Sequence, residues 1–195
     1  MTIAIVLGNG RSRQSIDSTF LKQHGTVYAC NAVYREFTPD VLIATDLPIA
    51  QAIQESGYAL KHRFYTRKPM EGLGAQRLSK EYYGFSSGPN AVGRACLDGY
   101  TQIFMLGFDL GTTNGQFNNI YADTDFYKKS TAPPTFSGNW VKQIAQICKD
   151  YSTREFIRVM GPESATIPTL DAIPNLKNMT ILDFKDRINT SRGLL

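Results

Sequence analysis

The segment IAIVLGNG, residues 3–10, joins five consecutive apolar residues to a turn that contains two glycines. A short apolar run without polar alternation is typical of a strand that is buried on both faces, as in a parallel sheet. The turn Gly8-Asn9-Gly10 supplies the conformational freedom that a tight connection from a strand to a helix needs. This segment therefore predicts an α/β fold.

The rest of the chain continues the alternation of strands and helices. Apolar runs predict further strands at residues 26–30, 40–45, 63–66, 102–106, 155–160 and 179–182. Helical spacing predicts helices from Ser15 or Asp17 to about Gly25 and at residues 48–56, 89–97 and 138–151. The order predicts a single domain over residues 1–195, with a Rossmann-like, mostly parallel sheet and helices on both faces. The polar segment at about 111–137 is too long for an ordinary connection, so we expect it to form a lid.

Composition and charge limit the class of protein. Of the 195 residues, 42% are hydrophobic and 11% aromatic, which excludes an intrinsically disordered chain. No apolar run is long enough for a membrane helix and no basic leader precedes the first strand, so we expect a cytoplasmic protein. The net charge of +4 is compatible with a phosphate-bearing ligand and too small to indicate a nucleic-acid partner. Cys30, Cys96 and Cys148 lie in apolar runs and are expected to be core thiols. A homo-oligomer remains open.

Polar and small residues follow the predicted strands. In an open α/β sheet ligands bind beyond the carboxyl ends of the strands, so we expect these residues to form the site. They are Gly8, Asn9 and Gly10 after the first strand, Asn31 after the second, Asp46 after the third, Ser86, Ser87 and Gly88 before a helix, and Asp109 after the strand at 102–106. The two glycines either bring backbone N–H groups to a phosphate or only form the turn. The serines either cap the helix or bind an anion.

Several enzyme classes are excluded. The dinucleotide fingerprint lacks its third glycine, and Asn31 stands where an acid would hold the ribose of NAD. No phosphate-binding Gly-Lys-Ser or Gly-Lys-Thr sequence occurs. The two histidines, His24 and His62, lie outside the motifs, so no nucleophilic triad is predicted. Asp123 and Asp125 either hold a divalent cation such as Mg²⁺ or pair by chance, and we expect no essential metal or cofactor.

The order of these motifs resembles the bacterial lipooligosaccharide sialyltransferases. A wider relative is the hydroxymethylpterin diphosphokinase-like family. The likeness covers residues 3–151. Its motifs are the Gly-Asn-Gly turn, Ile16-Asp17, Cys30-Asn31, Ser86-Ser87-Gly88 and Gly107-Phe108-Asp109.

The resemblance implies a donor of the CMP-sugar type, a mobile lid and no essential metal. It places Asn9 and Gly10 at the phosphate or ribose and Asn31 at the cytidine. The other implied contacts are Ser87 and Gly88 on the nucleotide, Asp109 shaping the pocket, and Tyr121 and Tyr127 as tyrosines of the lid.

Three positions depart from the pattern of that family. Asn139 stands at the position of the catalytic histidine, and an amide cannot take a proton from an acceptor hydroxyl. Gly84 replaces an arginine, and Asp46 replaces an asparagine. We therefore expect the nucleotide site to be better preserved than the transfer chemistry, with Asp46 or Asp109 as the candidate base.

Two alternatives remain for the function. One is a Mg²⁺-dependent phosphoryl transferase of the diphosphokinase type, in which Asp46 helps to hold the metal. The other is a non-catalytic binding or structural protein, for instance a component of a phage virion, because fold alone does not fix function.

Overall fold

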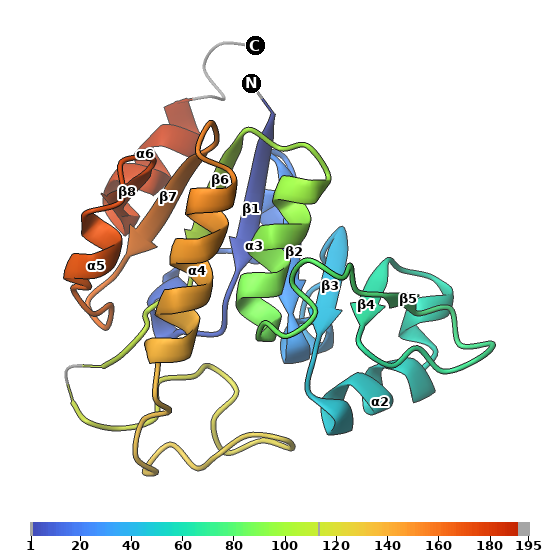
Figure 1. Cartoon of the computed structure of the whole chain (residues 1–195). Coiled ribbons are helices and arrows are strands. Elements are labelled where there is room, and N and C mark those ends of the chain that lie inside the picture. The colour runs from blue at the N-terminus through green and yellow to red at the C-terminus, as the bar shows by residue number, and fades with distance from the viewer. Residues whose placement is uncertain (1, 113, 191–195) are drawn as a thin grey trace.

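A computed structural model describes residues 2–112 and 114–190 (Figure 1). The strands found there are β1 (Ile3–Leu7), β2 (Thr26–Cys30), β3 (Val41–Ala44), β4 (Phe64–Thr66), β5 (Gln76–Arg77), β6 (Gln102–Leu106), β7 (Glu155–Met160) and β8 (Leu176–Thr180). They form one parallel sheet in the order β5-β4-β3-β2-β1-β6-β7-β8. The predicted Rossmann-like sheet is confirmed, and it is parallel throughout.

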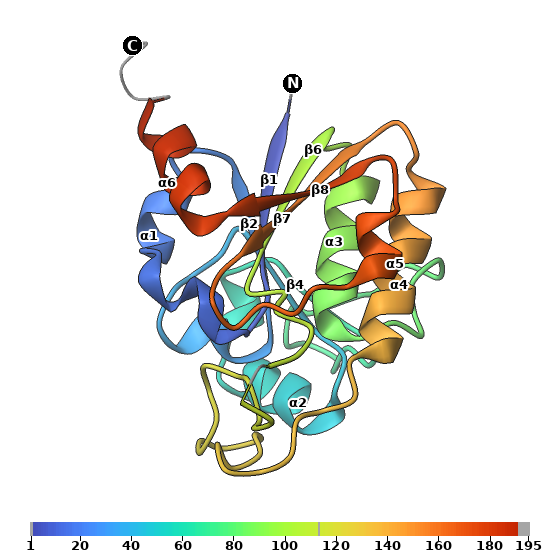
Figure 2. The same cartoon turned by 90° about the vertical axis from the view of Figure 1, so that its left-hand side faces the viewer.

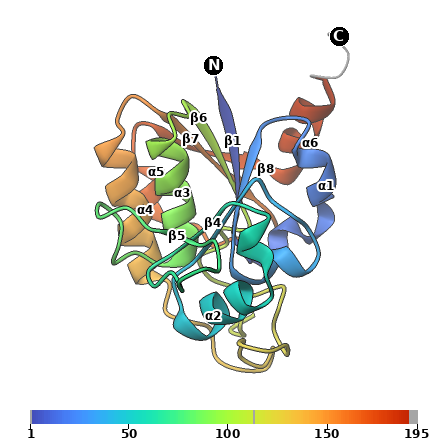
Figure 3. The same cartoon turned by 90° about the vertical axis from the view of Figure 1, so that its right-hand side faces the viewer.

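The helices cover both faces of the sheet. They are α1 (Ser18–Leu21), α2 (Leu47–Glu55), α3 (Ser87–Leu97), α4 (Gly138–Asp150), α5 (Pro168–Asp171) and α6 (Ile181–Thr190), with 3₁₀ turns at Arg11–Ser15, Asn31–Arg35 and Tyr58–Leu60. Figure 2 shows α1 and α6 on one face and α3, α4 and α5 on the other, and the opposite view in Figure 3 agrees. No helix among residues 2–112 and 114–190 is long and apolar enough to cross a membrane.

Strand β1 shows why both faces need helices. Its residues alternate between two buried clusters, with Ile5 and Leu7 in one and Ala4 and Val6 in the other. Successive side chains of a strand point to opposite faces, so an unbroken apolar run gives two apolar faces. The core therefore lies on both sides of β1, as the opening segment predicts. Cys30, Cys96 and Cys148 are buried and form no disulfide, which confirms them as core thiols, and Cys96 and Cys148 lie within one of these clusters.

The direction in which successive strands are added to the sheet reverses at β1. Strands β2 to β5 lie on one side of it, and β6 to β8 lie on the other. The lid, residues 111–137, lies at the carboxyl ends of the strands (yellow in Figure 1). Within residues 114–137 it consists of turns and bends and contains no helix or strand.

Two segments differ from the sequence predictions. The last strand ends at Thr180 and α6 begins at Ile181, whereas the apolar run predicted a strand over 179–182. Leu182 is exposed in α6, while Phe184 and Ile188 are buried, so the apolar residues belong to an amphipathic helix. The first helix is also shorter than predicted. Asp17 caps its N-terminus by accepting a hydrogen bond of 2.9 Å from the backbone N–H of Thr19.

Candidate functional site

A cavity of about 370 Å³ lies at the carboxyl ends of β1, β2, β3 and β6, under the lid. This is the position at which α/β sheets bind ligands. The structure brings nine of the predicted site residues together in its wall: Gly8, Asn9, Gly10, Asn31, Asp46, Ser86, Ser87, Gly88 and Asp109. Three others, Tyr121, Tyr127 and Asn139, do not line it. Asn139 is exposed at the beginning of α4, while the next residue, Trp140, reaches the cavity.

Two asparagines that line this wall have unpaired side-chain oxygen atoms. The Oδ1 atoms of Asn9 and Asn31 are closed off from solvent and have no hydrogen-bond partner among the described residues. The Nδ2 group of Asn9 donates to the Oη atom of Tyr127 over 3.4 Å, so only its oxygen is unpaired. Asn31 adopts a φ of 55°, a left-handed conformation that asparagine tolerates better than most residues. Because buried polar atoms normally have a partner, these two acceptors indicate a ligand that carries hydrogen-bond donors.

The glycines of the turn serve packing rather than phosphate binding. The N–H groups of Gly8 and Gly10 donate to the carbonyl oxygens of Leu106 (2.8 Å) and Gly107 (2.9 Å). A Cβ atom on Gly10 would lie 2.4 Å from Oδ2 of Asp109. Of the two roles predicted for these glycines, the geometry favours formation of the turn over binding of a phosphate. They let the connections after β1 and β6 approach closely, and neither N–H group is left for a ligand.

Asp109 is buried and its carboxylate is occupied by the protein. Oδ2 accepts hydrogen bonds from the backbone N–H of Ser12 (3.1 Å) and from Nδ2 of Asn118 (3.0 Å). Oδ1 accepts from the hydroxyl of Ser164 (2.9 Å). All three hydrogen bonds come from the protein, so both oxygen atoms of this carboxylate are already occupied. Asp109 therefore shapes the wall, and the geometry does not favour it as the base.

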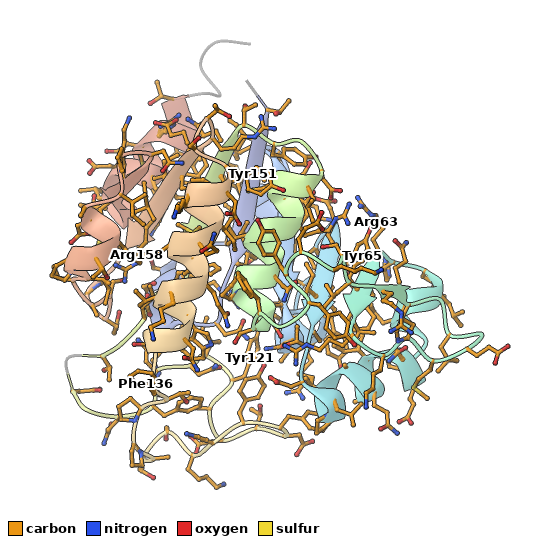
Figure 4. All side chains as sticks on the ribbon, viewed as in Figure 1. Arg63, Tyr65, Tyr121, Phe136, Tyr151 and Arg158 are labelled. Atoms are coloured by element: carbon orange, nitrogen blue, oxygen red, sulfur yellow. The ribbon has the colours of Figure 1, made fainter. Side chains whose placement is uncertain are left out.

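A buried arginine holds the backbone around Asp109. Arg158 of β7 is 1% exposed and points toward the end of β6 (Figure 4). Its guanidinium donates to the carbonyl oxygens of Phe108 (2.9 Å), Asp109 (2.8 Å) and Ala165 (2.8 Å). Burial lowers its pKa, while the charge of Asp109 opposes that shift. Three charge-assisted hydrogen bonds thus fix the segment that forms one side of the cavity.

Asp46 differs from Asp109 in its burial and in its hydrogen bonds. It is exposed, it lies at the N-cap of α2, and its side chain makes no capping hydrogen bond. It lines both the main cavity and a smaller one beside it. Of the two acids predicted as the base, Asp46 is the one with a free carboxylate at the cavity.

The beginning of α3 contributes backbone N–H groups. The hydroxyl of Ser87 accepts a hydrogen bond from the N–H of Thr45 (2.9 Å), and the N–H of Ser86 donates to Oε1 of Gln143 (2.9 Å). The first turn of a helix leaves its N–H groups without acceptors in the helix, and here those of Ser87 and Gly88 border the cavity. The positive end of the helix dipole favours an anion at this point.

The lid closes the cavity and is fastened to the domain. Its residues Phe117, Asn118, Asn119, Pro134 and Thr135 line the wall. Asn118 fastens the lid at two points. Its Nδ2 donates to Asp109, and its Oδ1 accepts a hydrogen bond from the backbone N–H of Arg11 over 2.9 Å. The aromatic residues of the lid include Tyr121, which lies toward the domain, and Phe136, which is 75% exposed (Figure 4).

The two lid tyrosines hold the lid in place. The hydroxyl of Tyr121 donates to Glu36 and accepts from Nη2 of Arg13 over 3.1 Å. The Oη atom of Tyr127 accepts from the N–H of Ala32 over 3.3 Å as well as from Asn9. Burial raises the pKa of both phenols. Tyr127 contacts the site through Asn9, whereas Tyr121 binds Arg13 and Glu36, which form an ion pair of 3.6 Å with each other.

The possible metal ligands lie away from the cavity. Oδ1 of Asp123 accepts from the N–H of Ser130 over 3.1 Å, and neither Asp123 nor Asp125 lines the wall. In the part of the chain that the structure describes, no three His, Cys, Asp or Glu side chains converge on a point that could hold a metal. The thiol of Cys30 does line the cavity, and burial raises its pKa to about 12, so it is not a thiolate at neutral pH.

Comparison with known proteins identifies the fold. No protein-family model and no curated protein matches the chain. Solved structures of the sialyltransferase CstII from Campylobacter jejuni do. The complex with cytidine-5′-monophosphate has a TM-score of 0.52 and 18% identity, covering 90% of this chain and 86% of that one. The complex with CMP-3FNeuAc has a TM-score of 0.56 and 17% identity, covering 90% and 87%. The chain has a sialyltransferase fold.

A third CstII structure extends this likeness. The complex with a trisaccharide acceptor and CMP has a TM-score of 0.56 and 17% identity, and covers 89% of this chain and 87% of that one. The likeness therefore covers most of both chains. The predicted resemblance to sialyltransferases is confirmed for the fold.

Proposed function

We propose that this protein is a glycosyltransferase-like protein that binds a cytidine nucleotide sugar in the cavity under the lid. The observation that carries the proposal is the pair of buried, unpaired Oδ1 atoms of Asn9 and Asn31. The hydroxyl groups of a ribose and the amino group of cytosine are donors of the kind that these acceptors lack. The fold shared with a sialyltransferase that was solved with CMP supports the choice of cytidine.

The phosphate belongs at the beginning of α3. The N–H groups of Ser87 and Gly88 and the helix dipole offer the positive end that a phosphate needs. The same groups stabilise the charge that develops on the phosphate oxygen when the bond to the sugar breaks. Gly8 and Gly10 take no part, because their N–H groups are already used.

Asp46 is the base in this proposal. An acceptor hydroxyl oxygen forms a bond to the anomeric carbon of the donor sugar, the bond from that carbon to the phosphate oxygen breaks, and CMP leaves. The hydroxyl proton passes to the free carboxylate of Asp46. Asn139 is an amide on the surface, and Asp109 already accepts three hydrogen bonds, so neither takes that proton.

Nucleotide binding tests the proposal. CMP is expected to raise the melting temperature more than AMP, GMP or UMP does, measured by a thermal shift assay. Asn31→Gly removes the amide and keeps the left-handed backbone, so CMP affinity should fall about fivefold to tenfold with little change in the melting temperature of the free protein. Asn139→Ala, an exposed change outside the cavity, is the matched control and should bind CMP as the wild type does.

The outcomes separate the competing functions. Equal stabilisation by all four nucleotides would overturn the cytidine proposal. Turnover of a pterin with ATP that requires Mg²⁺ would favour phosphoryl transfer, and self-association without nucleotide binding would favour a structural protein. Asp46→Asn is expected to retain CMP binding and to lose sugar transfer, because the amide keeps the size of the side chain and cannot accept the proton.

A further inference from the structure

The charged side chains in the wall of the cavity under the lid are both acidic. Among the described residues that line it, they are Asp46 and Asp109, and no lysine, arginine or histidine takes part. Asp109 already accepts three hydrogen bonds from the protein. Asp46 is exposed, caps no helix through its side chain and forms no ion pair in the described part of the chain. A ligand in this cavity therefore meets one free charge, and that charge is negative.

The negative charge of Asp46 acts on groups inside the site as well as at its rim. Burial is the main cause of the raised pKa of Cys30, and the charge of Asp46 raises that pKa further. Burial is also the main cause of the raised pKa of Tyr127, and Asp46 contributes there too. Cys30 lines the cavity, and Tyr127 contacts Asn9, which we assign to the nucleotide. The electric field of Asp46 thus extends from the beginning of α2 to the donor site.

The cations on the other side of Asp46 leave this charge without a partner. Arg67 and Lys68 line a smaller cavity between the beginning of α2 and the end of β4. The guanidinium of Arg67 donates to the carbonyl oxygens of Tyr83 and Phe85, each over 2.8 Å, and Lys68 is exposed. Among the described residues neither cation forms an ion pair with Asp46. No ion pair therefore neutralises the carboxylate of Asp46.

The positive end of α3 can hold one anionic group. The N–H groups of Ser87 and Gly88 are assigned to the phosphate of the donor. The N–H of Thr45 donates to the hydroxyl of Ser87 over 2.9 Å, so the residue that follows Thr45, Asp46, lies beside this phosphate position. A donor sugar that carries a carboxylate brings a second negative charge to the same place. It would find no cation in the wall and would be repelled by Asp46.

The rest of the wall suits an uncharged sugar. Phe117, Pro134 and Trp140 line the cavity with apolar surface, against which the C–H groups of a sugar ring can pack. An ionised carboxylate only accepts hydrogen bonds, so Asp46 is a partner for sugar hydroxyl groups. Its two oxygen atoms allow it to accept from a hydroxyl of the donor sugar and still receive the proton of the acceptor.

We propose that the donor carries a neutral sugar into this cavity, and that Asp46 selects against sugars with a carboxylate. This inference rests on the proposed cytidine nucleotide site and adds the chemical class of the transferred sugar. It separates this protein from its structural neighbour CstII, which was solved with CMP-3FNeuAc, a nucleotide sugar whose sugar carries a carboxylate. Specificity then comes from a repulsive group as well as from attractive contacts.

The experiment compares two probes that differ in one charge, CMP-3FNeuAc and its methyl ester, with CMP as the reference. Titration calorimetry measures their affinities. The ester should bind about three- to fivefold more tightly than the acid, because the repulsion by Asp46 is partly screened by water. Added salt should reduce that difference. The ester should bind at least as tightly as CMP, since its sugar adds contacts with the apolar wall.

Substitution of Asp46 locates the source of the selection. Asp46→Asn keeps the size of the side chain and removes its charge, so the acid should gain about three- to fivefold in affinity and the ratio of ester to acid affinity should approach one. Asp125→Asn is the matched control, because Asp125 is exposed on the lid and does not line the cavity. It removes the same charge from the protein and should leave the ratio at its wild-type value.

The results separate this inference from the donor site. A protein that binds CMP but binds the acid as tightly as the ester, or more tightly, would overturn the selection and retain the proposed function. An ester that binds more weakly than CMP would overturn the neutral sugar. Equal ratios in Asp46→Asn and Asp125→Asn would remove Asp46 as the selecting group. A protein that binds none of the three probes would refute the proposed function, and this inference with it.

Discussion

The three residues of the Gly8-Asn9-Gly10 turn have different physical roles. A Cβ atom added at Gly8 would lie 2.6 Å from the carbonyl oxygen of Gly107, and one added at Gly10 would have even less room. Real Cβ atoms do not approach backbone so closely, and close packing leaves little space to relax. Asn9, between them, lines the cavity, and its buried Oδ1 atom has no hydrogen-bond partner in the described residues. The glycines position the turn, and the asparagine is the group that we propose to meet the ligand.

Gly10→Ala is therefore expected to destabilise the free protein by about 2 kcal/mol, since the new methyl group overlaps the carboxylate of Asp109 and the carbonyl of Gly107. Urea unfolding measures this difference. Gly84→Ala is the control, because a Cβ atom at Gly84 meets no other atom within 4 Å and Gly84 has no positive φ. Equal stability of the two variants would refute the packing role of Gly10.

The residue pattern predicts the site better than it predicts the partners of each site residue. Asn31, Asp46 and Asp109 follow strands, and parallel strands end at one edge, so local sequence is enough to bring them together. The partners of Asp109 are Ser12, Asn118 and Ser164, from three separate segments. No local pattern reports such contacts. Sequence reasoning could not tell from the chain alone that Asp109 is occupied and Asp46 is free.

At the level of elements, the central strands are the most predictable. Strands β1, β2 and β6 are continuous apolar runs, and their structural bounds equal the predicted ones. The edge strand β5 has two exposed residues, Gln76 and Arg77, and therefore no apolar signal to detect. At the other edge, β8 exposes Lys177, Asn178 and Thr180 and has no continuous apolar run. The apolar residues that follow belong to α6, so the predicted strand extends too far along the chain.

The lid was predicted as an element, but its attachment was not. Asn118 joins it to the connection after β1 through Arg11 and to the end of β6 through Asp109. Polar asparagine and threonine residues occur throughout the segment, and nothing in the sequence singles out Asn118. Its contacts cross 107 positions in the chain to Arg11, a separation at which sequence patterns carry no information.

Asn118→Ala is expected to loosen the lid. The change removes the hydrogen bonds to Arg11, Asp109 and the carbonyl oxygen of Gly111, and such bonds contribute about 1 kcal/mol each. Local opening should become more frequent, so a protease should cleave within residues 111–137 severalfold faster, while the domain remains intact. Limited proteolysis followed by mass spectrometry locates and times the cuts.

Thr131→Ala provides the comparison within the same lid. Thr131 is exposed and its side chain has no hydrogen bond in the described part of the chain, so its loss should leave the cleavage rate unchanged. Cleavage of Asn118→Ala at the wild-type rate would show that the lid is held by its tyrosines alone. CMP should also slow the cleavage of the wild type if the nucleotide binds beneath the closed lid.

On the scale of the whole molecule, burial keeps all three thiols protonated. Cys30 lies at the end of β2, and Cys96 and Cys148 lie in α3 and α4. Burial raises the pKa of each to about 12, from the ordinary value of 9.0. The cause is the same in each case, because an apolar surrounding disfavours the charged thiolate. Because these thiols are buried, the free energy of unfolding depends on pH in the alkaline range.

This coupling predicts that the free energy of unfolding falls as the pH rises above about 9. In the window from about 9 to 12 the unfolded chain releases its thiol protons while the native protein retains them, so the unfolded state binds fewer protons and gains stability. Each thiol should cost about 1.4 kcal/mol between about pH 8 and pH 10. Below that window both states keep their protons, and the thiols have no effect on stability.

Urea unfolding under reducing conditions at about pH 8, 9 and 10 measures the slope. Cys96→Ala lowers the stability at every pH through the lost packing, but it should also remove one thiol from the slope, about a third of the thiol contribution. The pH dependence, rather than the stability itself, is thus the specific readout. Tyrosines whose pKa burial raises above the ordinary value of 10.0 also contribute as the pH approaches 10, so the difference in slope between Cys96→Ala and the wild type, rather than the slope itself, isolates the thiol. An unchanged slope in Cys96→Ala would mean that this thiol ionises equally well in the native protein, and that the interior around α3 is open to water.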